Sequence, residues 1–188
     1  MDKKGKPSDQ GIQYNVFYRD VKYARLEYKT GTLTLILPRD YENERSILEK
    51  HRTWITQKTH IINQALEKAK AKTLNKNRTD EELRSLVVQK VDKYKQRYAF
   101  SINKVYFRRM KSKWGSCSSK GNLTINRLLK YLPEELIDYI VFHEMVHSQE
   151  KRHNELFWSY IGKEFTSWQT FEKDLLVYWF LIKSDRKG

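Results

Sequence analysis

The amino-acid sequence predicts an α+β protein, and three patterns support this fold class. Apolar and polar residues alternate near the N-terminus, which is the two-residue period of β-strands. A long stretch with helical spacing follows, and two short strand-like segments then precede several more amphipathic helices. With 188 residues, the chain is long enough for one domain, or for one domain with a small appendage.

The first predicted element is a small antiparallel sheet that ends at Pro38. The polar residues 1–11 are expected to form a loose lead-in. Thr30-Gly31 favours a hairpin turn between the last two strands. The tyrosines of the sheet are interpreted as core residues rather than as a surface for stacking bases. The predicted strands are Ile12–Tyr18, Val21–Tyr28 and a segment around Leu33, Leu35 and Leu37.

Two helices are predicted next. The first runs from about Asn43 to Lys72, and the two asparagines between Leu74 and Arg78 interrupt the helical pattern. Thr79 or Asp80 can cap the second helix, which extends to Tyr98. We therefore divide the chain into the lead-in, a sheet-and-helix region over residues 12–78, and a core over residues 79–188.

After this second helix, the core is predicted to contain two short strands, Val105–Met110 and Leu123–Leu128, joined by a turn-rich connection. The second strand is a candidate edge on which an extended peptide could pair through its main chain. Three helices follow: one from Pro133 to about Gln149, one capped by Asn154, and one that carries Trp168 to Trp179.

The helix from Pro133 contains the sequence His-Glu-x-x-His. Residues four apart share a helix face, so His143 and His147 can present two imidazoles to one metal ion. Glu144 projects to another side, from which it can reach a metal-bound water without being a ligand. Burying two histidines and a glutamate on an otherwise apolar helix without a metal would cost free energy of desolvation. A purely structural role for these residues is therefore disfavoured.

His153 offers a third nitrogen, provided that the helix ends near Gln149 or Glu150. No glycine is present there, so a residue with a side chain must make the turn. Three protein ligands with an open fourth position are typical of catalytic zinc, whereas four ligands close a structural site. The sequence therefore predicts a Zn²⁺ ion held by three histidines, with Glu144 as the catalytic base.

Three other features limit the environment in which the chain works. Cys117 is the single cysteine, which excludes an intramolecular disulfide and indicates a reducing compartment; we interpret it as structural. The N-terminus has no apolar signal core, and the longest apolar run, Leu175–Ile182, is too short to span a bilayer. We therefore expect a cytoplasmic protein without a membrane partner.

The net charge is +14, and its distribution is uneven. No acidic residue occurs between Asp92 and Glu134, an interval that holds eleven lysines and arginines. Such a run indicates either a solvated surface or a non-specific nucleic-acid partner. The candidate contacts for a substrate or a nucleic acid are Arg108, Arg109, Lys111, Lys113, Trp114 and Asn126.

Several stretches together resemble the YgjP-like metallopeptidases. The most specific is Trp114-Gly115-Ser116-Cys117 followed downstream by His143-Glu144, His147 and His153, and the resemblance extends from about Ile12 to Trp179. It implies a zincin-like core of a small sheet, a backing helix and an active-site helix, and a kinship with SprT-type and WLM-type proteases. Ser148-Gln149 and Arg152-His153-Asn154 depart from the usual pattern, but neither departure removes a ligand.

The resemblance implies zinc-dependent hydrolysis of peptide bonds, in which Glu144 activates the zinc-bound water, acting on a peptide or protein substrate. Some members of the family are assigned a nucleotide pyrophosphatase activity, which is one alternative. The other alternative is a nucleic-acid-binding protein with a vestigial zinc site. No glycine-rich phosphate loop or carboxylate cluster for magnesium is visible in the sequence, and Glu144 is retained, so the peptidase is favoured.

Overall fold

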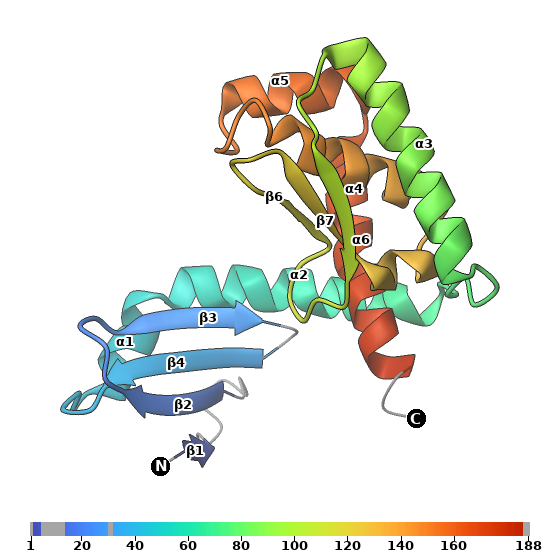
Figure 1. The fold of residues 1–188 in the computed structure, drawn as a ribbon. Helices are drawn as coiled ribbons and strands as arrows, with labels where there is room; N and C mark the ends of the chain where they lie inside the picture. Colours follow the sequence, from blue (N-terminus) through green and yellow to red (C-terminus); the bar gives the residue numbers. More distant parts are fainter. Residues whose placement is uncertain (1, 5–13, 30–31, 186–188) are drawn as a thin grey trace. The chain divides into compact units, whose positions relative to one another are not determined.

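A computed structural model describes residues 2–4, 14–29 and 32–185, and it has the mixed α+β composition that the sequence predicts. The chain divides into two compact units, one ending at Lys68 and one beginning at Ala69 (Figure 1). The sequence pattern had suggested a division at residues 78 and 79. Of the helices in the described residues, none combines the length and the hydrophobicity that crossing a membrane requires.

The N-terminal unit contains a four-stranded sheet in the order β1-β2-β4-β3. β3 and β4 form the expected antiparallel pair, but β2 lies parallel to β4, so the prediction of an all-antiparallel sheet is wrong. Alternation of side chains marks a strand without specifying its partner, which explains the error. The strands are β1 (Asp2–Lys4), β2 (Tyr14–Arg19), β3 (Arg25–Lys29) and β4 (Thr32–Pro38).

β1 pairs with β2 in an antiparallel register, so part of the predicted loose lead-in is a strand. Ile12 and the Thr30-Gly31 turn lie outside the described residues. The buried face of this sheet consists of Val16, Leu33, Leu35 and Leu37, packed with Ile47 and Ile55. The four strand residues of this set belong to the apolar positions that alternate in the sequence, so the two-residue period correctly identified the buried face of the sheet.

The single long helix expected after this sheet is two helices, α1 (Glu44–Lys50) and α2 (Arg52–Lys70). The Asn43 side chain caps α1 by accepting the Ser46 N–H at 3.0 Å. His51 separates the helices because its backbone, at φ −107° and ψ 15°, leaves the helical region. The apolar stripe continues across this break, so the sequence pattern gave no sign of it.

The C-terminal unit contains a three-stranded sheet in the order β5-β7-β6. β5 (Lys104–Arg108) runs parallel to β7 (Asn122–Asn126), and β6 (Gly115–Cys117) runs antiparallel to β7. The strand predicted as a free edge is therefore the central strand, and that prediction is wrong. In the sequence β6 is indistinguishable from the turn around it, because three residues are too few to show an alternating pattern.

Helix α4 (Glu134–Val146) lies in the middle of this unit, in contact with β6, β7, α3, α5 and α6 (Figure 1). Nearly every residue from Leu136 to Val146 is buried. A 3₁₀ turn, η1 (Arg127–Tyr131), leads into it. The surrounding helices are α3 (Asp80–Tyr98), α5 (Glu155–Glu164) and α6 (Trp168–Asp185).

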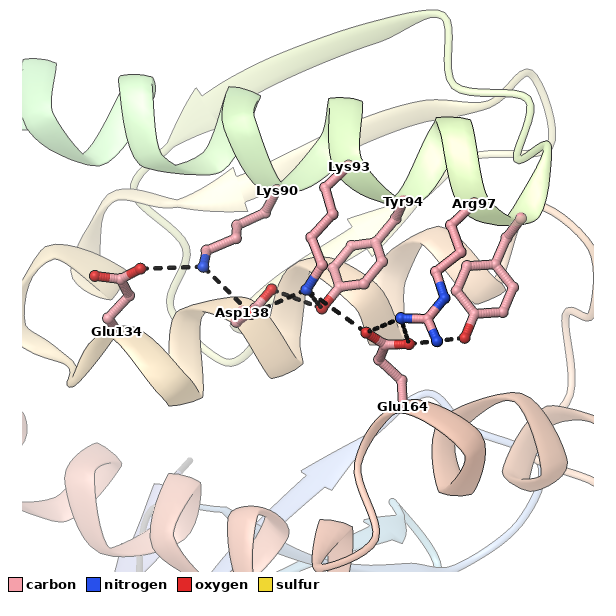
Figure 2. A network of polar contacts seen from close by, with 8 residues as sticks. Lys90, Lys93, Tyr94, Arg97, Glu134, Asp138 and Glu164 are labelled. Atoms are coloured by element: carbon pink, nitrogen blue, oxygen red, sulfur yellow. Dashed lines mark hydrogen bonds and ion pairs between the residues drawn. The ribbon is translucent and has the colours of Figure 1, made fainter.

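A polar network joins α3 to α4 and α5 (Figure 2). Tyr94 on α3 donates a hydrogen bond to Asp138 on α4 at 2.8 Å, and Lys90 contacts the same carboxylate at 3.3 Å. Glu164, at the end of α5, accepts from Arg97 at 2.9 Å and from the Tyr98 hydroxyl at 2.8 Å. These contacts fix α3 against α4 and α5, and the rings of Tyr94 and Tyr98 pack on Phe142 in the buried aromatic cluster.

Candidate metal centre and cleft

Helix α4 carries His143 and Glu144 in its last turn, and His147 is the residue at its C-terminal cap. His153 follows after a short turn. Side-chain nitrogens of the three histidines all lie within 4.8 Å of one another, and His143 Nε2 is 3.1 Å from His153 Nε2. In the part of the chain that the structure describes, this is the one group of three or more potential metal ligands.

The helix must end early for His153 to reach the other two histidines. It ends at Val146, three residues before the end predicted from the sequence, and the N–H groups of Gln149 and Glu150 both bond to the Val146 carbonyl. Residues with side chains make this turn, as expected, and no residue between Val146 and His153 has a positive φ. A tight turn of ordinary residues therefore reverses the chain here.

Two contacts hold His153 after this turn. The Trp158 indole N–H donates to the His153 carbonyl at 3.1 Å, and the two rings stack with centroids 5.8 Å apart. Asn154 caps α5 by accepting the Phe157 N–H at 3.1 Å, as the sequence predicts. The start of α5 thus fixes the position of the third histidine.

The outer nitrogen of His147 has a defined partner. Its Nδ1 lies 3.0 Å from the Glu150 carbonyl oxygen, which can only accept a hydrogen bond. The ring must therefore donate through Nδ1, which leaves the Nε2 lone pair available to a metal. Burial lowers the pKa of His143 to about 3 and also lowers the pKa of His147, so both rings are neutral and able to act as ligands.

These features fit a bound zinc ion. The donor set is three imidazole nitrogens, which suits zinc, and no fourth protein ligand closes the group among the described residues. One ligand nitrogen from each ring lies within 4.8 Å of the other two, which is close enough for one ion to bind all three. A closed structural site would require a fourth cysteine or histidine, so the arrangement matches the open, catalytic type of site.

Glu144 is 9% exposed and packs directly against the backbone of β6. A Cβ atom on Gly115 would lie 2.7 Å from Glu144 Cγ, so a side chain at position 115 would displace this carboxylate. Burial raises the pKa of Glu144 to about 7; Lys113 opposes this shift and Glu172 adds to it. Such a carboxyl can accept and return a proton near neutral pH.

A cleft of about 430 Å³ opens over these residues. It is lined by Lys113 to Cys117, which includes all of β6, and by residues of α4 and α6. Within the described residues β6 has no strand paired on its second side, so it is the sheet edge that faces the cleft. The lining also includes Tyr139, Ile140, His143, Glu144, His147, Lys151, His153, Glu172 and Leu175.

The residues predicted to contact a substrate or a nucleic acid are dispersed. Lys113 and Trp114 line the cleft, whereas Arg109 lies in a separate small pocket with Asp80 and Arg127. Lys111 is exposed, and Arg108 lies over the ring of Tyr106 at 5.8 Å. The structure places these basic residues on more than one surface.

The prediction for Asn126 is wrong, because its side chain is completely buried. Its amide donates to the carbonyls of Met110 and Lys113 and accepts the N–H of Leu128. Asn126 therefore holds the loop before β6 and cannot reach a ligand in this structure. Cys117 is free and half-buried, and burial raises the pKa of its thiol, in keeping with a structural role.

Sequence reasoning did not assign several of the cleft residues to the site, and three of these, Gly115, Tyr139 and Glu172, contact its ionisable groups. Tyr139 and Glu172 read as members of amphipathic helices, and Gly115 read as part of a turn. Tyr139 lies one helical turn before His143, a spacing that could have placed it at the site. Glu172 is nineteen residues beyond His153, and no local pattern links them.

Comparison with known proteins gives a family and two solved structures. The family model of the YgjP-like metallopeptidase domain matches residues 59–177. The metallopeptidase zymogen abylysin from Pyrococcus abyssi is 26% identical, with a TM-score of 0.39, over 42% of this chain and 79% of that one. The metallopeptidase zymogen jannalysin from Methanocaldococcus jannaschii is 22% identical, with a TM-score of 0.41, over 56% and 95%. Among curated proteins none is similar enough to count as a match.

Proposed function

The chain belongs to the YgjP-like metallopeptidase family, and from this premise we propose that it is a zinc-dependent peptidase acting on peptides or proteins. His143, His147 and His153 hold the metal, and Glu144 is the general base. The observation that carries this proposal is the convergence of three imidazoles within 4.8 Å beside a buried carboxyl group, in one cleft.

A zinc ion bound by these histidines would supply Lewis acidity, which would polarise a carbonyl and lower the pKa of a bound water towards about 7. The Glu144 carboxylate takes the proton from the attacking water and delivers it to the leaving amine. Its raised pKa suits both transfers, because a group with a pKa near the working pH can accept and then release a proton. Gly115 leaves room for the carboxylate at this position.

The edge of β6 is the place where we propose that the substrate binds. An extended peptide can add to an unpaired strand through main-chain hydrogen bonds, without demanding a particular side-chain sequence. β6 provides such an edge beside Glu144, and the cleft is open towards it. The scissile bond would then lie between β6 and the histidines of α4.

One comparison tests the proposal. The Glu144→Gln variant is expected to retain its zinc and to lose hydrolysis of casein by about 10²–10⁴-fold, because glutamine has the same shape but cannot accept the proton. His143→Ala is expected to lose most of its zinc, as measured by elemental analysis. Full zinc occupancy in His143→Ala, or activity near wild type in Glu144→Gln, contradicts the assignment.

The same protein should be incubated with UTP, since pyrophosphatase activity without casein hydrolysis would favour the nucleotide alternative. A specific observation also favours weak nucleic-acid binding as a second property. Lys104, Tyr106 and Arg108 alternate along β5 and are all exposed, which places one aromatic ring between two cations on the same strand face. Such a surface can contact phosphates and stack on a base.

A further inference from the structure

His143 Nδ1 is a buried polar atom that has no hydrogen-bond partner among the described residues. It differs in this respect from His147, whose Nδ1 meets the Glu150 carbonyl at 3.0 Å. Metal-binding histidines usually donate their second N–H to a carboxylate or a carbonyl, which fixes the tautomer and the ring orientation. The structure therefore provides this outer contact for His147, whereas His143 Nδ1 has no carbonyl or carboxylate within hydrogen-bonding distance among the described residues.

The group that it faces is a carboxylate from α6. Glu172 Oε1 lies 3.7 Å from His143 Nδ1, slightly beyond hydrogen-bonding distance. The Tyr139 hydroxyl donates to the same oxygen at 2.6 Å. Tyr139 is completely buried, and its ring packs against Phe165 and Phe171, so the hydroxyl is fixed. A rigid donor on α4 thus holds an otherwise half-exposed carboxylate, 42% accessible, beside the ring of His143.

We propose that Glu172 is a positioning residue for His143, and this inference rests on the proposed function of the site. Its carboxylate accepts the Nδ1–H of His143 once the separation closes to about 2.8 Å, the usual length of a charge-assisted hydrogen bond. The ring is then held as the Nδ1–H tautomer with the Nε2 lone pair directed at the other two histidines. Tyr139 supports this role by orienting the carboxylate.

The geometry argues against Glu172 as a metal ligand itself. The two nitrogens of an imidazole point away from each other across the ring, and Glu172 contacts the Nδ1 side. His153 lies on the Nε2 side, where its own Nε2 is 3.1 Å away. One oxygen of the carboxylate is also already occupied by the Tyr139 hydroxyl.

Zinc affinity of the full chain tests this role, measured by competition with a chromophoric chelator. Loss of such an outer partner typically weakens metal binding about 10–100-fold, which is the effect expected for Glu172→Ala. Glu172→Gln should weaken binding less, because its amide oxygen still accepts the Nδ1–H. Tyr139→Phe should also have a smaller effect, since the carboxylate remains but loses its support. Asp174→Asn is the control, because it neutralises a carboxylate on the same helix that instead contacts Lys72.

A second measurement is independent of the metal and of activity. ¹⁵N NMR of the metal-free protein reports the tautomer of His143, which is expected to be Nδ1–H in the wild type and mixed in Glu172→Ala. This spectrum also shows whether each variant is folded. Unchanged affinity together with an unchanged tautomer in Glu172→Ala would overturn the inference and leave the peptidase proposal intact.

Substitution of Co²⁺ for Zn²⁺ tests whether Glu172 is instead a metal ligand. If Glu172 were a ligand, Glu172→Gln would lose as much affinity as Glu172→Ala, and the visible absorption of the Co²⁺ protein would change in both variants. That result overturns the positioning role while the metal site remains. Failure of the proposed function has a different signature, namely a His143→Ala variant that keeps its zinc, or a zinc-loaded wild type without hydrolysis.

Discussion

Gly115 and Glu144 illustrate how one missing side chain shapes the site. A Cβ atom on Gly115 would approach Glu144 Cγ to 2.7 Å and Oε1 to 3.1 Å, so the glutamate side chain would have to move. We expect Gly115→Ala to displace the carboxylate and to lower kcat by at least about 10-fold, because misplacing a catalytic group by about 1 Å can cost 10²-fold. Zinc content should stay near one per chain, since no ligand is changed.

Gly162 provides the matched control. It lies within α5, and apart from its chain neighbours and the backbone of its own helix, no atom of the described residues would come within 4 Å of a Cβ added there. Gly162→Ala should leave activity unchanged and raise the free energy of unfolding by about 0.5–1 kcal/mol, because alanine favours the helix over glycine. Thermal or urea unfolding measures this increase. A Gly115→Ala variant as active as Gly162→Ala would show that Glu144 is not held against β6.

At the residue scale, the sequence was sufficient to predict the three proposed histidine ligands but not the residues that surround them. The spacing of His143, His147 and His153 was sufficient to predict that they come together, because a helix and one reversal determine their distances. Asn126 was misassigned because a buried asparagine that bonds to backbone groups looks the same in sequence as an exposed one. Glu172 could not be found, since its proximity to His143 depends on the packing of α6.

At the scale of elements, the network of Figure 2 predicts how α3 contributes to stability. The Glu164 side chain is 8% exposed and accepts bonds from Arg97 and Tyr98. Glu164→Gln should lower the free energy of unfolding by about 1.5–3 kcal/mol, the usual range for hydrogen bonds to a charged group. Denaturant unfolding of the zinc-free protein measures the change without a contribution from metal binding.

The corresponding control is Glu49→Gln. Glu49 pairs with Arg45 at 3.2 Å on α1, and both side chains are largely exposed, at 68% and 77%. An exposed pair of this kind contributes about 0.3–0.5 kcal/mol. Equal effects of the two substitutions would mean that the Glu164 contacts are no stronger than ordinary surface pairs.

Helices were predicted more accurately than strands for a physical reason. The Thr79 cap of α3 and the Asn154 cap of α5 are local, and both form as expected. Strand pairing joins residues distant in sequence, so the parallel pairs β2 with β4 and β5 with β7 left no local signal. β6 is marked only by its contacts with β7 and α4, which a three-residue segment cannot encode by itself.

At the scale of the whole molecule, the positive charge predicts salt-sensitive binding of nucleic acid. The net charge is +14, and β5 presents Lys104 and Arg108 on one exposed face. We expect weak binding without sequence preference, with log affinity falling linearly with log salt at a slope of about −0.9 per phosphate contacted on duplex DNA. Titration of fluorescent DNA at low and moderate salt measures this slope.

The Lys104→Glu/Arg108→Glu double variant should bind DNA more weakly. The slope of its log affinity against log salt should be shallower by the contribution of about two phosphate contacts. The Lys111→Glu/Lys113→Glu variant is a less selective probe, because Lys113 also lines the cleft. Identical binding by wild type and the β5 variant would leave the charge as a solubility feature. The peptidase proposal does not depend on this result, since it rests on the histidines and Glu144.

The burial of α4 has a kinetic consequence for the metal site. Because this helix is covered by two strands and three helices, its amide hydrogens are shielded until the C-terminal unit opens cooperatively. In hydrogen–deuterium exchange, amides from Ile140 to Val146 should therefore be among the slowest, whereas those between Ser148 and His153, in the exposed turn, should exchange early. Local opening of that turn would release His153 while His143 and Glu144 stay in place, so the third ligand would be the first to detach.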